Sequence, residues 1–277
     1  MVTTGSEDRM PPITQPKNFA SRKELSDHVA SITPGIVRTD PGPVTGSRQS
    51  LKERLDALDP VAYGRSRNFL DGKVSQLSCF IRHGMISLNQ VRNLALDRVR
   101  KPADAEKFIQ ELAWRDYWRR VQKAHPDWIW HDVEAYKTGF AAAEYSDHLE
   151  DDIRDGKTGV AAIDDIIVRL KTTGYVHNHA RMYLASYVVH WRRIRWQAGA
   201  RFMLEHLVDA DLASNNLSWQ WIASTFSRKP YIFNLENMRK YAGGHINTDA
   251  EANRPLDASY EELTARLFPR FRSPEHG

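Results

Sequence analysis

The chain has 277 residues, 27% of them charged and 41% hydrophobic, with a formal charge of +4, so it is an ordinary globular chain that permits an anionic partner without requiring one. Its single cysteine, Cys79, excludes an intramolecular disulfide and a multi-cysteine iron–sulfur cluster and fits a reducing compartment. No apolar run approaches the roughly 18–20 residues that cross a bilayer, and no signal-peptide pattern is present, so we expect a cytoplasmic protein without a membrane partner.

Apolar periodicity and capping residues predict an all-α chain. Residues 1–46 are polar and rich in proline, and we expect a flexible N-terminal extension with one short helix, in which Ser21 is the cap and Glu24 follows three residues later. Residues 47–277 are expected to form a single helical domain. Helices are expected over 21–32, 47–58, 75–83, 87–100, 104–125, 146–156, 160–172, 178–196, 200–207, 217–224 and 259–267, with loops over 63–72 and 128–140.

The stretch HLVDADLASNNLSWQWIAS, residues 206–224, places small polar side chains between apolar runs. It contains Asp209 and Asp211, an Asn pair, and two Trp around one Gln. A buried polar group without a partner costs on the order of 1–3 kcal/mol, so these groups need a ligand or one another. Helix capping is an equally good explanation of the Asp pair.

Four segments carry a family resemblance. TGYVHNHARM (173–182) and DADLASNNLSWQW (209–221) are similar to the flavin-binding core of the photolyase/cryptochrome family. DGKVSQLS (71–78) resembles its phosphate-binding stretch, and FIQELAWRD (108–116) resembles the helix that faces DNA. The resemblance implies a helical FAD-binding domain, and because only 50 residues precede the matching region we expect a short member without the family's N-terminal antenna domain.

The resemblance also implies which side chains hold FAD. Arg181 and Asp209 match an ion pair packed along the flavin ring. Asp211 matches a carboxylate that accepts a hydrogen bond from the ring edge or ribityl chain, and Asn215 matches the amide that faces flavin N5. The full set of expected cofactor-binding residues is Tyr63, Ser75, Ser78, Arg115, Arg181, Asp209, Asp211 and Asn215.

Glu111 and Trp114 lie three residues apart and are predicted to share one face of a helix. A carboxylate beside an aromatic ring suits a flipped-out base, because the acid reads polar edges while stacking contributes about 1–3 kcal/mol. From spacing alone, a surface ion pair between Glu111 and Arg115 explains the same residues. By resemblance, Tyr175 replaces the family's usual Trp. The expected catalytic residues are Glu111, Trp114, Asn178, Met182 and Trp221, and the expected DNA-binding residues are Arg119, Arg120, Arg228 and Lys229.

The chain has eight tryptophans, and two of them, Trp219 and Trp196, match the first members of the family's electron relay. The resemblance places Ala143 where the family has a third, exposed Trp. We therefore expect Tyr145 or Trp191 to substitute for it, or the relay to be shorter. For other tryptophans we expect core packing, as at Trp128 and Trp130.

The resemblance implies light-driven DNA repair, in which electron transfer from photoexcited reduced FAD splits cyclobutane pyrimidine dimers. The expected partner is UV-damaged DNA, single- or double-stranded, and we expect a monomer. The alternatives are a cryptochrome-like blue-light sensor that binds FAD and signals without repair, and a flavin-binding remnant with neither activity. The residues also permit a nuclease-like divalent metal site, which we do not favour, formed by His177, His179, Asp209 and Asp211.

Overall fold

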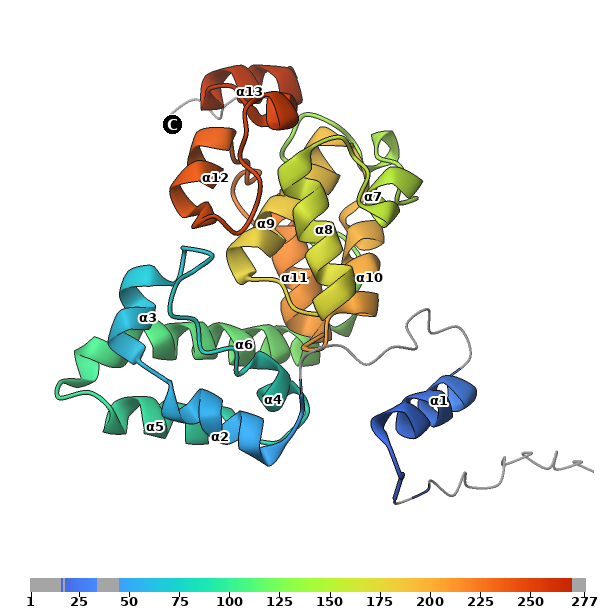
Figure 1. The fold of residues 1–277 in the computed structure, drawn as a ribbon. Helices are drawn as coiled ribbons and strands as arrows, with labels where there is room; N and C mark the ends of the chain where they lie inside the picture. Colours follow the sequence, from blue (N-terminus) through green and yellow to red (C-terminus); the bar gives the residue numbers. More distant parts are fainter. Residues whose placement is uncertain (1–15, 17, 34–44, 271–277) are drawn as a thin grey trace, which may run out of the picture. The chain divides into compact units, whose positions relative to one another are not determined.

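The computed structural model describes residues 16, 18–33 and 45–270, and these residues form helices and connecting loops (Figure 1). Among them there is no β-strand, and an isolated bridge joins Ser146 to Ile194. The chain divides into two units, residues 1–43 and 44–277, which are described separately. The α-helices are α1 (Arg22–Ile32), α2 (Arg48–Asp56), α3 (Pro60–Ser66), α4 (Ser78–Arg82), α5 (Leu88–Asp97), α6 (Glu106–Ala124), α7 (Asp151–Asp155), α8 (Ala161–Thr173), α9 (Asn178–Ser186), α10 (Trp196–His206), α11 (Leu212–Ala223), α12 (Leu235–Ala242) and α13 (Tyr260–Leu267).

The first unit contains α1, the short helix expected over 21–32. Ser21 Oγ accepts a hydrogen bond from Glu24 N at 3.1 Å, and Glu24 Oε2 accepts one from Ala20 N at 2.6 Å. These local contacts confirm the predicted cap. Most of the expected flexible extension lies outside the described residues.

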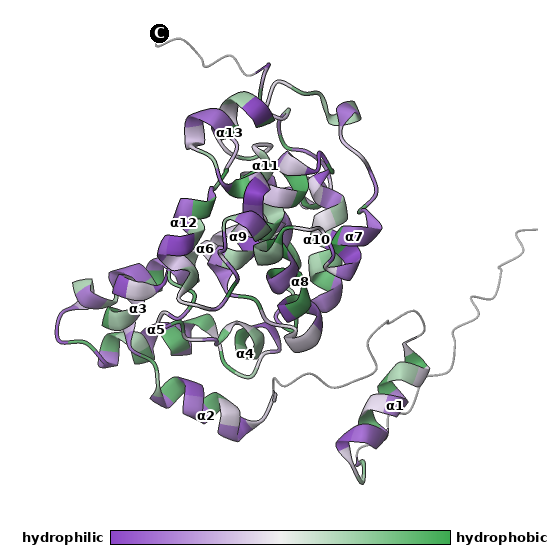
Figure 2. Ribbon diagram, turned by 45° about the horizontal axis from the view of Figure 1, so that its top comes forward, coloured by the Kyte–Doolittle hydropathy of each residue, from purple (hydrophilic) through white to green (hydrophobic). Residues whose placement is uncertain are grey.

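The second unit is built around α8, whose apolar residues recur at helical spacing. Ile163, Ile166, Ile167 and Leu170 are all buried, in one core with residues of α9, α10 and α11. A second apolar cluster joins α5 and α6 to the segment around α4, and α6 also packs on α11. Figure 2 shows hydrophobic residues along α8, whereas α2 is largely hydrophilic. Among the described helices, none has the length and apolarity needed to cross a membrane.

Two helices begin directly after a capping aspartate, and their bounds differ from the expected ones. A helix, α3, replaces the first part of the loop expected over 63–72, because Asp59 accepts from Ala62 N at 2.9 Å and Pro60 supplies the first helical residue. Likewise α11 begins at Leu212, five residues before the expected start, because Asp211 caps it.

The helix expected over 178–196 is broken. After α9 the chain forms a π-helical turn, η4 (Tyr187–Trp191), and Arg193 then adopts a left-handed conformation with φ of 55°. The guanidinium of Arg193 lies 3.5 Å from the centre of the Phe140 ring and donates to Leu267 O at 2.7 Å. These distant contacts hold the turn, and α10 begins at Trp196.

Two further helices of the second unit differ from what the sequence predicts. The solvated helix expected over 146–156 shortens to α7, and its Ile153 is fully buried in the core. The helix α12 was not predicted. It begins after Asn234, whose side chain accepts a hydrogen bond from Asn237 N at 2.9 Å. By contrast, the last helix, α13, agrees with the helix expected over 259–267, and Ser259 is its N-cap.

Candidate functional site

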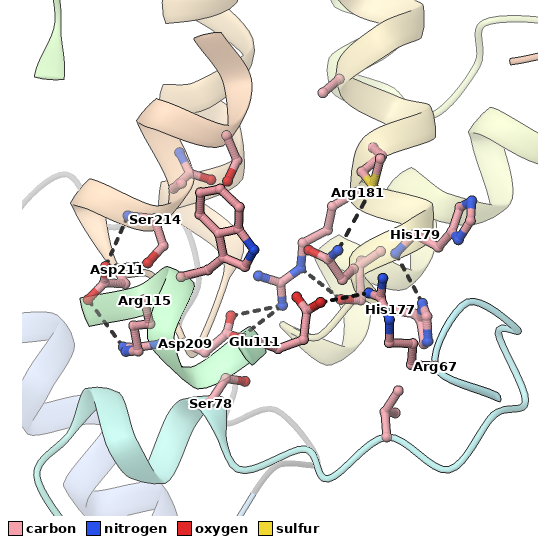
Figure 3. Close-up of a pocket in the computed structure, with 18 of the residues that line it drawn as sticks. Arg67, Ser78, Glu111, Arg115, His177, His179, Arg181, Asp209, Asp211 and Ser214 are labelled. Atoms are coloured by element: carbon pink, nitrogen blue, oxygen red, sulfur yellow. Dashed lines mark hydrogen bonds and ion pairs between the residues drawn. The ribbon is translucent and has the colours of Figure 1, made fainter. Parts of the chain in front are cut away.

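A cavity of about 780 Å³ lies in the second unit, within the range of roughly 300–1,000 Å³ usual for small-molecule sites. Side chains from α3, α6, α9 and α11, and from the turn before α4, line it (Figure 3). All eight residues expected to hold a cofactor and all five expected catalytic residues line this cavity. Segments far apart in sequence therefore meet at one place.

The predicted ion pair between Arg181 and Asp209 is present in the cavity wall (Figure 3). Arg181 Nη2 donates to Asp209 Oδ1 at 3.0 Å and Oδ2 at 2.9 Å, and Arg181 Nε donates to Val176 O at 2.8 Å. Burial alone would raise the pKa of Asp209, but Arg181, together with the Ser78 hydroxyl, lowers this pKa below its usual value. A buried anion and a half-buried cation are thus fixed side by side.

Asp211 both caps α11 and binds two arginines. Its Oδ1 accepts from Ser214 N at 3.0 Å and Ser214 Oγ at 2.8 Å. Its Oδ2 accepts from Arg115 Nη2 at 3.1 Å and from Arg119 Nη2 at 2.8 Å. Burial would raise the pKa of Asp211, but the Ser214 N–H and the two arginines lower it. Arg119, expected to contact DNA, is held at the cavity wall by this carboxylate.

The two neighbouring amides, Asn215 and Asn216, have different partners. Asn215 Nδ2 donates to Ala200 O at 3.2 Å and to Asn216 Oδ1 at 3.0 Å. Because a backbone carbonyl can only accept, this contact fixes the orientation of the amide. No described residue donates to Asn215 Oδ1, which is therefore available to a ligand N–H. Asn216 is buried and donates to Ile129 O at 2.7 Å instead.

Two buried nitrogen atoms of cavity-lining residues, Arg115 Nε and His177 Nε2, have no partner among the described residues. His177 Nδ1 accepts from His179 N at 3.1 Å, so the neutral ring carries its proton on Nε2. Burial, followed by the charges of His179 and Arg181, lowers the pKa of His177 to about 4. Each unsatisfied donor costs on the order of 1–3 kcal/mol, which indicates that a ligand supplies acceptors here.

The turn before α4 differs from the expected hydroxyl-capped helix over 75–83. The helix begins at Ser78, and its N-cap, Leu77, makes no side-chain hydrogen bond. Ser75 Oγ accepts weakly from Leu77 N at 3.4 Å. Gln76 has a φ of 51°, a left-handed conformation that costs on the order of 1–3 kcal/mol in a residue with a side chain and is typical of ligand sites.

Glu111 does not pair with Arg115, so the simple surface ion pair is wrong. Its Oε1 lies 3.1 Å from Arg67 Nη1 and 3.5 Å from Lys107 Nζ (Figure 3). Arg67 was not among the expected site residues, because its role depends on a contact between α6 and the segment after α3. The carboxylate is held at the cavity by two cations.

Two large aromatic side chains of the cavity wall are also exposed to solvent: Trp114 is 47% exposed and Trp221 is 42% exposed. Trp114 stacks on Trp118, with ring centroids 5.3 Å apart. Asn178 Nδ2 lies 3.9 Å from Met182 Sδ at the same cavity. Exposed rings at an open cavity provide stacking surfaces for a planar ligand.

The metal alternative finds no support. Among the described residues, no group of three or more His, Cys, Asp or Glu side chains is placed to hold a metal ion. The two aspartates are instead engaged by arginines, and His177 is oriented by a backbone N–H. The four residues considered above therefore do not form a metal site.

Trp219 and Trp196 lie in helices that pack on each other, α11 and α10. Trp219 is buried and lines the cavity, and its ring lies against Gly199, one turn after Trp196. Trp196 is fully buried and donates from Nε1 to Asp132 Oδ1 at 2.6 Å. Both tryptophans are therefore part of the rigid core beside the cavity.

The two residues expected to end the relay, Tyr145 and Trp191, lie in different surroundings. Tyr145 is only 4% exposed, and its ring stacks on Tyr136 at 4.3 Å. The Trp191 ring has Tyr187 and Phe233 as its ring neighbours. Tyr145 is thus buried where the loop before α7 folds onto the core, and its part in the relay stays a prediction.

The site fits the FAD that the family resemblance implies. It combines a cavity of suitable volume, unpaired donors at Arg115 and His177, and a free acceptor at Asn215. The indole of Trp219 adds an aromatic wall. These are the partners that a ligand with an aromatic ring system, carbonyl groups and phosphates requires.

Comparison with known proteins agrees with this geometry. Residues 108–246 match the family model described as the FAD-binding domain of DNA photolyase. The chain is 31% identical over 201 residues to a deoxyribodipyrimidine photo-lyase of Streptomyces griseus, a match that covers 72% of this chain and 42% of that protein. The chain thus spans about two fifths of the length of such curated relatives.

Solved structures show the same fold. A cryptochrome of Synechocystis aligns with a TM-score of 0.68 at 20% identity, over 90% of this chain and 57% of that one. An archaeal photolyase of Sulfolobus tokodaii, solved with two FAD molecules, aligns with a TM-score of 0.62 at 24% identity, over 86% of this chain and 55% of that one. With FAD as its cofactor, the chain belongs to the family of FAD-binding domains of DNA photolyases.

Proposed function

We propose that this protein binds FAD and uses light to split cyclobutane pyrimidine dimers in DNA. One observation carries the proposal: Glu111 and the exposed rings of Trp114 and Trp221 open onto the same cavity as the Arg181–Asp209 pair. A flipped-out base stacked on these rings would lie next to the cofactor. Such proximity is what a transfer between cofactor and substrate requires.

Each residue has a part in this proposal. Trp114 and Trp221 stack on the flipped bases, and Glu111 and Asn178 hydrogen-bond their polar edges. Met182 fills the apolar side of the pocket beside Asn178. When bound, FAD supplies the photoexcited electron that opens the dimer, and the protein supplies binding, orientation and exclusion of water.

Exposed cations outside the cavity would contact the phosphates. Arg228 and Lys229 are exposed and form no ion pair with a described residue, whereas Arg120 is paired with Asp116 at the surface. Each phosphate contact releases counterions, so DNA binding should weaken as salt rises. Extruding the damaged bases costs less from a single strand than from a duplex, so we expect tighter binding to single-stranded DNA.

One observation favours a light sensor without repair as the second candidate. Glu111 is already paired with Arg67 and Lys107, so base reading requires it to exchange partners. Tyr175, in place of the family's usual Trp, also reduces the stacking wall. A sensor would retain FAD and show no repair.

The Glu111→Gln variant tests the proposal. A hydrogen bond to a charged group contributes about 1.5–3 kcal/mol, so losing the carboxylate should lower the repair rate by roughly 10- to 100-fold. Repair of a dimer-containing single-stranded oligonucleotide would be measured under blue light with chemically reduced protein, against a dark sample.

Glu106→Gln is the matched control, because Glu106 lies on the same helix, is exposed and does not line the cavity. It should repair at the wild-type rate. If the wild-type protein retains FAD but repairs no more in light than in darkness, the sensor proposal replaces repair. If Glu111→Gln loses bound flavin, the assignment of Glu111 to the substrate is wrong.

A further inference from the structure

Trp130 stacks on the buried Trp196 indole and remains partly exposed. The two rings stack almost parallel, with an interplanar angle of 6° and centroids 6.4 Å apart. Trp196 itself is fully buried, and no described residue accepts a hydrogen bond from Trp130 Nε1. The fold thus places one indole between a fully buried indole and solvent.

We propose that Trp130 is the surface end of an electron relay that runs from Trp219 through Trp196. The inference rests on the proposed light-driven function. With oxidised FAD bound and photoexcited, Trp219 would give up one electron to it. An electron from Trp196 refills Trp219, and an electron from Trp130 refills Trp196. Trp130 then releases its N–H proton to water and becomes a neutral indole radical, which a thiol in solution reduces by giving back a hydrogen atom.

The segment that carries Trp130 is irregular, yet buried amides hold it firmly. Asn216 Nδ2 donates to Ile129 O at 2.7 Å, and Gln197 Nε2 donates to Trp130 O at 3.3 Å. Gln220 Nε2 donates to His131 O at 3.1 Å, and Gln220 Oε1 accepts from Val133 N at 3.1 Å. Polar residues of α10 and α11 therefore fix the position of the Trp130 backbone.

Charges around the two rings favour a positive charge on Trp196 over one on Trp130, so proton loss from Trp130 drives the last transfer. The Asp132 carboxylate accepts from Trp196 Nε1 at 2.6 Å and so stabilises a positive charge on the buried indole. The Arg201 guanidinium lies 4.7 Å from the centre of the Trp130 ring and opposes a positive charge there. An oxidised Trp130 therefore favours losing its proton to the adjacent solvent, which prevents return of the electron.

The test compares Trp130→Phe with Trp128→Phe in the FAD-loaded protein. Trp128 is the matched control, because it lies in the same segment but stacks on His125. After a light flash in the oxidised state, transient absorption should show a long-lived indole radical in wild type and Trp128→Phe and its loss in Trp130→Phe. A nitroso spin trap, followed by peptide mapping, should locate the adduct on Trp130.

Trp130→Tyr provides the rescue, because a tyrosine ring can also be oxidised and should restore a long-lived radical. The inference is overturned if Trp130→Phe keeps the wild-type radical lifetime, or if the spin trap marks Tyr145 or Trp191. Repair by chemically reduced Trp130→Phe should equal that of wild type, since that reaction does not use the relay. If the wild-type protein forms the radical but repairs no dimers, the proposed repair is overturned and the relay is not. If the protein binds no flavin, the proposed repair and the relay are both overturned.

Discussion

Asp209 and Asp211 stand one residue apart, and the fold gives them different roles. Asp209 is almost entirely buried and is held by one arginine, while Asp211 caps a helix and binds two. The sequence left capping and ligand binding as competing explanations. In the structure Asp211 caps α11 and also lines the cavity, because α11 begins at the cavity wall.

Replacing Asp209 by Asn should leave the Arg181 charge without an anionic partner in the cavity wall. Removing one partner of a buried pair costs about 3–5 kcal/mol, so the free energy of unfolding without flavin should fall by that amount. Urea denaturation at neutral pH measures it. Asp116→Asn is the control, because its pair with Arg120 is largely exposed and such pairs contribute about 0–1 kcal/mol. Equal losses in the two variants would contradict this account of the pair.

At the scale of helices, the sequence predicted some of the helices that are capped by a side chain next to their first turn. The cap at Ser21 predicted α1, and the helix expected over 259–267 is α13, which Ser259 caps. The break after α9 was not predictable in this way, since Arg193 depends on Phe140 and Leu267, which are distant in sequence. Turns fixed by tertiary contacts leave no local pattern.

The packing of α10 on α11 depends on the missing side chain of Gly199. A Cβ there would lie 2.3 Å from Cη2 of Trp219, a buried ring that cannot move away. Overpacking of this kind costs about 1–3 kcal/mol, so Gly199→Ala should lower the free energy of unfolding and, by displacing Trp219, weaken flavin binding. Flavin titration and urea denaturation together measure both effects.

Gly64→Ala is the matched control for Gly199→Ala. Gly64 lies within α3, and a Cβ there would meet only the Cβ of Lys107 at an ordinary 3.6 Å. Alanine in a helix is favoured over glycine by roughly 0.5–1 kcal/mol, so this variant should be slightly more stable. If both variants are equally destabilised, the close approach of Trp219 is not the cause.

At the scale of the whole molecule, the sequence predicted which residues line the cavity but not all of their partners. The thirteen expected residues converge because the family pattern encodes the cavity across four segments. Arg67 and Trp130 were not identified as functional, since their roles depend on which distant side chain they meet, Glu111 for one and Trp196 for the other. A motif indicates the chemistry of its own residues, but only the folded structure shows which side chains of different motifs meet.

Two buried histidines, His177 and His190, and the half-buried His179 make the stability of the protein depend on pH. Burial is the largest cause that lowers the pKa of His177, His179 and His190 from 6.5 to about 4. Between these values the unfolded chain binds protons that the folded chain does not. The free energy of unfolding must therefore fall as pH decreases from 6.5 towards 4, and these groups add no further loss below that range.

Urea denaturation of the flavin-free protein at pH 7.5, 6.0 and 4.5 measures this loss. For His190, which is fully buried, the change amounts to on the order of 3 kcal/mol at the acid end. The His190→Asn variant keeps a donor for Ile222 O, which His190 Nε2 contacts at 2.9 Å, but it does not titrate. Its unfolding free energy should depend less on pH than that of wild type. A wild-type free energy that stays constant from pH 7.5 to 4.5 would show that the three rings are protonated without unfolding, and so that the core around them is open to water.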